Sequence, residues 1–245
     1  MSKRTLILRP RGQHTMANIT EPEYIINHFL RAYITEITRT AVANRTSADT
    51  QSYNGDGSDK TFITTIQPLA YTSVVVDGTT MTPYLDYQID LDQKTITFTA
   101  APGVGTSNIV VSFLKGSNWI YPDEARRDLK KPSFPRIVTS KLSESSTLEG
   151  ASEDKMFNNI TFQIDILSYK EQMCTIGGEQ KEGQDVATYL ARQVVAGIRS
   201  NWRAGMKNAL FNPTILNNFS VPFDVPNNIF RNIIEVQFQA FNTGE

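Results

Sequence analysis

The sequence predicts an α+β fold: an antiparallel sheet with two amphipathic helices packed on one face, plus a small all-β inserted module. In two segments, apolar residues recur at steps of three and four, the period of a helix with one buried face. In two others they alternate with polar residues, the period of a half-buried strand. Between Thr50 and Gly116 the composition changes to threonine, valine, aromatic and turn-forming residues, which is typical of short strands.

The first helix is predicted from Pro22 to about Asn44. Thr20-Glu21-Pro22-Glu23 forms a capping box with proline in the first turn, where its missing N–H costs nothing. His28 falls outside the apolar face, so we expect its side chain at the surface. The apolar face consists of Ile26, Phe29, Leu30, Tyr33, Ile34, Ile37 and Ala41.

Residues 50–118 are expected to fold as a unit, the inserted β module. Turn residues such as Asp77-Gly78 and Pro102-Gly103 separate its strands. The predicted strands are Thr61–Ile66, Tyr71–Val76, Tyr87–Leu91, Thr95–Thr99 and Asn108–Leu114. The rest of the chain divides into a flexible N-terminal arm, residues 1–19, and one α+β domain formed by residues 20–49 and 119–245.

Alternating apolar residues predict two strands after the module, at Asn159–Ser168 and Phe230–Phe241, and Arg136–Leu142 is a further strand candidate. Ser143–Lys155, between this candidate and Asn159–Ser168, is predicted to be a polar loop. A second helix is predicted to begin at Asp185, whose carboxylate can cap it. Its apolar stripe consists of Val186, Tyr189, Leu190, Val194, Gly197, Ile198 and Trp202, and a close helix contact would explain the glycine.

The bulk properties are those of a globular protein, with 245 residues, 40% of them hydrophobic, and a net charge of -1. This charge gives no sequence-wide attraction to nucleic acid or acidic membranes. The single cysteine, Cys174, excludes an intrachain disulfide. No segment reaches the roughly 20 apolar residues of a membrane span, and the apolar run at residues 6–8 is too short for a secretory signal. We therefore expect a soluble, cytoplasmic product.

No residue pattern indicates catalysis, a cofactor or a metal site. His14 and His28 have no cysteine or second histidine at metal-ligand spacing, and Cys174 is expected to be inert in a loop. Residues 54–59 resemble a calcium loop in placing carboxylates around glycine, but the terminal glutamate is absent and an ordinary turn is favoured. Gly103-Val104-Gly105 opens no helix, which argues against a phosphate-binding loop.

Four basic residues, Arg192, Arg199, Arg203 and Lys207, put positive charge on the second helix and toward its end. Two interpretations remain open. The cations can simply complement the helix dipole, which contributes about 0.3–1 kcal/mol near a C-terminus. Alternatively, they form a wall that faces nucleic acid or another partner in the lumen of a ring.

Three short motifs in the second half of the chain are Phe134-Pro135-Arg136-Ile137-Val138, Leu142-Ser143-Glu144-Ser145-Ser146 and Ile160-Thr161-Phe162-Gln163-Ile164-Asp165-Ile166. In this order, before the helix Val186–Trp202 and the strand Ile233–Phe241, they resemble the tail-terminator and tail-completion (neck) proteins of tailed phages. The inserted module is similar to β modules of phage virion proteins. That similarity rests on Gly55-Asp56-Gly57, Val74-Val75-Val76-Asp77-Gly78 and Asp86-Tyr87-Gln88-Ile89.

The resemblance implies a tail-terminator-like domain and a structural virion protein without enzymatic activity or cofactor. It implies a homohexameric ring, assembled in the host cytoplasm, that ends the tail tube or sheath and joins it to the head–tail connector, with DNA passing through its lumen. A baseplate or head-side adaptor protein is the alternative of the same class. A carbohydrate-binding module is the alternative of another class, with Tyr71, Tyr84, Tyr87 and Trp119 as stacking faces.

Overall fold

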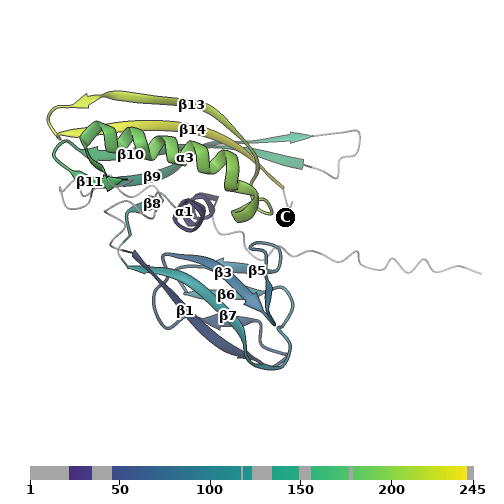
Figure 1. Ribbon diagram of the computed structural model, residues 1–245. Helices are drawn as coiled ribbons and strands as arrows, with labels where there is room; N and C mark the ends of the chain where they lie inside the picture. Colours follow the sequence, from purple (N-terminus) through teal and green to yellow (C-terminus); the bar gives the residue numbers. More distant parts are fainter. Residues whose placement is uncertain are drawn as a thin grey trace, which may run out of the picture.

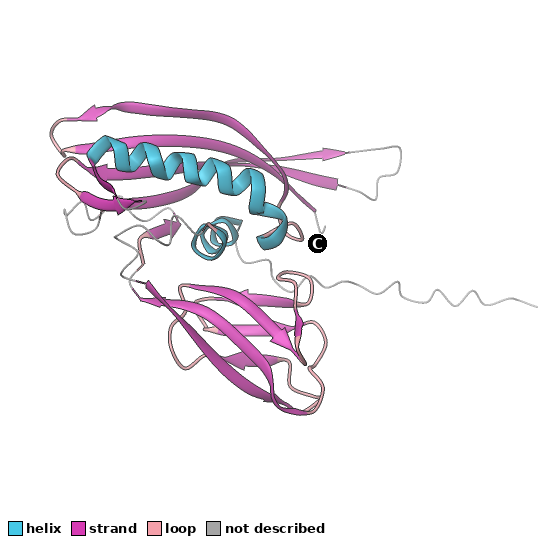
Figure 2. Ribbon diagram, in the orientation of Figure 1, coloured by secondary structure: helices cyan, strands magenta, loops and turns pink. Residues whose placement is uncertain are grey.

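The computed structural model describes residues 22–34, 46–116, 118–122, 134–148, 156–176 and 179–241. In these ranges the chain is a mixed α+β protein with two helices and mostly antiparallel sheets (Figure 2). The elements are α1 (Pro22–Tyr33), β1 (Thr46–Gly55), β2 (Thr61–Ile63), β3 (Ala70–Val76), β4 (Thr79–Thr80), β5 (Tyr87–Asp90), β6 (Thr95–Phe98), β7 (Gly105–Gly116), β8 (Ile120–Pro122), β9 (Arg136–Leu148), β10 (Met156–Tyr169), β11 (Met173–Ile176), β12 (Glu179–Glu182), α3 (Gly183–Gly205), β13 (Phe211–Asp224) and β14 (Ile229–Phe241).

The main sheet has five strands in the order β13-β14-β10-β9-β8, antiparallel except for the β8–β9 pair. Helix α3 lies across one face of it (Figure 1). The predicted alternation in β10 is confirmed, because Ile160, Phe162, Ile164 and Ile166 are all buried. The alternation predicted in the last strand is also confirmed, since Ile234, Val236 and Phe238 of β14 join the same core as Leu190 and Val194 of α3. The core therefore sits between α3 and this face of the sheet.

Helix α1 lies between α3 and the β module, where Figure 1 shows it end-on. Two glycines of α3 make this approach possible. A Cβ at Gly197 would lie 2.6 Å from the side chain of Ile34, and a Cβ at Gly205 would lie 2.6 Å from Tyr33 and 2.7 Å from Phe29. The close contact predicted at Gly197 is confirmed, and Gly205 serves the same packing.

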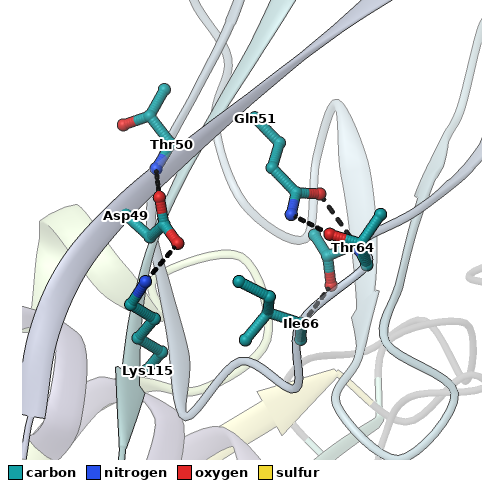
Figure 3. A network of polar contacts seen from close by, with 7 residues as sticks. Asp49, Thr50, Gln51, Thr64, Ile66 and Lys115 are labelled. Carbon is teal, nitrogen blue, oxygen red and sulfur yellow. Dashed lines mark hydrogen bonds and ion pairs between the residues drawn. The ribbon is translucent and has the colours of Figure 1, made fainter.

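Residues 46–116 form a four-stranded sheet, β1-β7-β3-β4, and a three-stranded sheet, β2-β6-β5. The five predicted strands are present, although β2 ends at Ile63 instead of Ile66. Strands β1 and β4 were not predicted. Strand β1 has few apolar side chains, and its backbone pairs with β7. Asp49 accepts a hydrogen bond from Lys115 of β7 at 2.6 Å, and a second one from the N–H of its neighbour Thr50 at 2.8 Å (Figure 3).

Two predicted helix boundaries are wrong. Helix α1 ends at Tyr33, and residues 35–45, over which it was expected to continue, lie outside the described residues together with Thr20, Glu21 and the predicted arm. Helix α3 begins at Gly183, and the residue before it, Glu182, makes no side-chain capping bond. Asp185 therefore lies in the first turn, where its charge favours the helix dipole, instead of capping the helix.

Two long stretches of strand were missed. Strand β9 continues to Leu148, so the first part of the predicted loop Ser143–Lys155 is strand, while residues 149–155 lie outside the described residues. Strand β13 occupies Phe211–Asp224, where no element was predicted. Ser143–Ser145 of β9 are exposed, and no residue of β13 is buried, so neither stretch shows the strong apolar alternation that burial of one face would impose.

Candidate functional site

Arg192, Arg199 and Arg203 are exposed on one flank of α3. At 100° per residue, the three positions fall within about 40° of one another around the helix axis. Lys207 is also exposed but lies past the end of α3, in the turn that follows, so its predicted place on the helix is wrong. The structure thus brings three of the four predicted residues into one row and puts the fourth beyond its end.

The C-terminal end of this row borders a cleft of about 320 Å³ between α3 and the β module. Arg203 and Lys207 line it on the helical side, while hydroxyl-bearing residues of the module line the other side: Thr72, Ser73, Thr80 and Thr82. Asn208 donates a hydrogen bond to the Pro83 carbonyl at 3.1 Å, which fastens the two walls together. None of the described residues that line the cleft is acidic, so its chemistry favours an anionic group.

A buried polar junction connects α1 to the β module. His28 is 2% exposed, and its Nε2 accepts a hydrogen bond from the Tyr71 N–H at 3.0 Å. Burial, together with the nearby Arg31 charge, lowers the pKa of His28 to about 3. The predicted surface position of His28 is therefore wrong, because the face of α1 opposite α3 is covered by β3. The imidazole is neutral at physiological pH and acts as a hydrogen-bond acceptor.

Arg31 connects α1 to both the module and the main sheet. Its guanidinium donates to the Leu69 carbonyl at 3.0 Å, just before β3, and to the carbonyl of Ile120 in β8. Burial lowers the pKa of Arg31 to about 10, which leaves it charged at neutral pH. These contacts fix α1 against the module, and they indicate a structural role for both residues.

The aromatic residues considered for carbohydrate stacking lie in the core. Tyr71 and Tyr87 are 0% and 2% exposed, and Tyr84 and Trp119 are 8% and 3% exposed. A sugar stacks on an exposed ring face, and these four side chains present none. The structure therefore offers no support for the carbohydrate-binding interpretation that rested on them.

Cys174 and the aspartate turn at residues 54–59 contribute to the fold. Cys174 lies in β11, not in a loop as predicted, and is fully buried. Asp56 accepts hydrogen bonds from the N–H groups of Ser58 at 2.8 Å and Asp59 at 2.7 Å, which is the turn favoured by the sequence. Within the described ranges, no group of three or more histidine, cysteine or acidic residues is placed to hold a metal ion. None of the helices described there is long and apolar enough to cross a membrane.

The main sheet exposes long edges. Among the described strands, β13 pairs only with β14, and Leu216 and Phe219 on it are 46% and 47% exposed. At the opposite end, β8 pairs with β9 only as far as Thr139. Leu142, on the stretch of β9 beyond that point, is 50% exposed. Exposed edges with apolar side chains are typical of surfaces that pair with another chain.

The fold and these surfaces define a mixed α+β protein whose exposed features are a basic row, a cationic cleft and two open sheet edges. A scan against protein-family models finds no match, and a search of curated proteins finds none either.

Proposed function

We propose that this chain is a structural protein of a bacteriophage neck, which forms a homohexameric ring at the end of the tail tube or sheath and joins it to the head connector. The observation that carries the proposal is the open edge formed by β13, a 14-residue strand with exposed Leu216 and Phe219. The tail-terminator-like motifs in β9 and β10 supply the phage context for this edge.

A long edge of this kind favours self-association. Monomeric proteins usually protect a sheet edge with short strands, charges or a covering segment, because unpaired N–H and C=O groups bind other strands. Strand β13 is long, and its only charged residue is Asp224 at its end. A contact between two different surfaces of identical subunits closes into a ring when the rotation between subunits permits. Ring assembly therefore gives this edge a partner.

The basic row on α3 suits a second contact of the same ring. No ion pair between described residues involves Arg192, Arg199 or Arg203, so their charges remain available to an external partner. Helix-dipole complementarity acts over the last turn only and gives no reason for Arg192. DNA in the lumen, or an acidic surface of a neighbouring neck protein, supplies the negative charge that this row matches.

The mass of the assembly, measured for the protein alone and for the protein bound to tail tubes, tests this proposal. A hexamer of this chain, six times 27.5 kDa, has a mass of about 165 kDa. Because a tail end can template assembly, purified protein should be measured by native mass spectrometry both before and after incubation with tail tubes. Bound subunits in numbers other than a multiple of three would contradict a sixfold ring. A carbohydrate-binding protein would instead give a signal on a glycan array and leave tail tubes unoccupied.

A further inference from the structure

In the part of the chain that the structure describes, the main sheet leaves backbone groups open at both of its ends. Strand β13 forms one end and, among the described strands, has no neighbour on its outer side. At the other end, β8 covers β9 only over Ile137–Thr139. Among the described strands, the stretch of β9 from Lys141 to Leu148 pairs with β10 alone, and Figure 1 shows this hairpin extending beyond the neighbouring strands.

The directions of the strands make the two open edges compatible. Strands β13, β14, β10 and β9 alternate in direction, because each neighbouring pair is antiparallel. Strand β13 therefore runs opposite to β9. A second copy related by rotation alone can add its β13 beside β9 of the first copy, and the new pair is again antiparallel. The antiparallel pattern continues from one subunit to the next without a break.

The side chains on the two edges also match. Leu142 on β9 and Leu216 and Phe219 on β13 are half exposed, and pairing would bury them together. The charges on the β9 edge are already neutralised, since Lys141 lies 3.2 Å from Glu144. No charged residue lies on β13 between Thr214 and Val221 to oppose it.

Two prolines limit where on β13 another strand can pair. Pro213 and Pro222 lack an N–H group and cannot donate to a ladder. They leave Thr214–Val221 as the window for pairing, which has the same length as Lys141–Leu148 of β9. Edges of equal length and opposite direction on one sheet are the features expected of head-to-tail strand addition.

We propose that Thr214–Val221 of one copy pairs antiparallel with Lys141–Leu148 of the next copy, so that the main sheet continues across the subunit boundary. This inference rests on the proposed function, because it names the surfaces through which the ring closes. It also predicts that α3 and its arginines lie on the same side of the continuous sheet in every subunit.

Disulfide cross-linking tests this pairing. Variants combine one cysteine on β9, Leu142→Cys or Ser145→Cys, with one on β13, Leu216→Cys or Phe219→Cys. The native Cys174 is buried and does not compete. After assembly on tail tubes and mild oxidation, a denaturing gel of at least one double variant should show a ladder of linked subunits.

Matched variants identify the source of any cross-link. Each single-cysteine variant should remain unlinked, and so should Val104→Cys, whose exposed side chain lies far along the chain in the loop before β7. A dimer formed by Phe219→Cys or Leu216→Cys alone would overturn the proposal in favour of a symmetric β13–β13 contact. A normal ring without a ladder in any of the four double variants would overturn it while leaving the proposed function intact. Wild-type protein that never forms a ring would overturn the proposed function and this inference with it.

A second measurement is independent of oxidation. Leu216→Lys combined with Phe219→Lys places charges on the open edge, which oppose strand addition. We expect the subunits bound per tail end to fall on the order of tenfold, with an unchanged melting temperature. Val225→Lys, at a 69% exposed position just after β13, is the control and should bind like wild type. Wild-type occupancy by the double-lysine variant would contradict pairing through β13.

Discussion

Acidification should destabilise the fold through His28, which is neutral and buried between α1 and β3. Its pKa is about 3 in the folded protein and 6.5 in the unfolded chain. Between these values the unfolded chain binds the additional proton, so stability falls as the pH decreases through 6.5 towards 3. From about pH 7.5 to about pH 5, this difference in pKa corresponds to a loss of about 2 kcal/mol in the free energy of unfolding.

Unfolding in urea should be measured at about pH 7.5 and about pH 5, with the fluorescence of the buried Trp119 as the signal. His28→Gln is the matched variant, because the glutamine side-chain oxygen can accept the bond from the Tyr71 N–H and does not titrate. Between about pH 7.5 and pH 5, the free energy of unfolding of the wild type should fall by about 2 kcal/mol more than that of this variant. Asp49 and Asp56, whose hydrogen bonds lower their pKa values, titrate at lower pH and affect both proteins equally. Equal losses in the two proteins would refute the assignment of His28 as a buried neutral acceptor.

Three further substitutions test the core, the helix contact and the basic row. Phe162→Ala should lower the free energy of unfolding by about 3–5 kcal/mol because the ring is fully buried. Gln163→Ala, on the opposite face of β10, should lower it by well under about 1 kcal/mol. Equal losses would mean that the strand register is wrong by one residue. Gly197→Ala should lower stability by about 1–3 kcal/mol, because the new methyl group would lie 2.6 Å from the side chain it faces; a higher melting temperature would contradict this packing. Arg199→Glu combined with Arg203→Glu should leave the melting temperature nearly unchanged while tails fail to join heads or eject DNA. Unfolding of that variant would show that the arginines belong to the fold, and normal infectivity would leave them as solvated surface.

The sequence predicted those elements that bury one face. Strand β10, strand β14 and helix α3 each show the period that burial imposes, and each was found near its predicted position. Strands β1 and β13 were missed because they lie at sheet edges, where pairing of the backbone holds a strand whose side chains are mostly polar or exposed. Periodicity carries no information about such strands.

The candidate site was predictable in part for a similar reason. Helical spacing was sufficient to group Arg192, Arg199 and Arg203 on one flank. The cleft beside Arg203 was not predictable, because its other wall comes from module residues more than a hundred positions away in the chain. The burial of His28 was missed because α1 has packing partners on two sides, while the sequence pattern revealed a single apolar face.

The proposed neck ring predicts one location for the protein in a phage particle, and that location can be imaged. Purified phage particles should be labelled with gold-conjugated antibody against this chain and imaged by electron microscopy. We expect label at the junction of head and tail in intact particles, and at the head-proximal end of isolated tails. Label at the distal end of the tail, or over the head surface, would contradict a neck ring and place the protein in the baseplate or on the head.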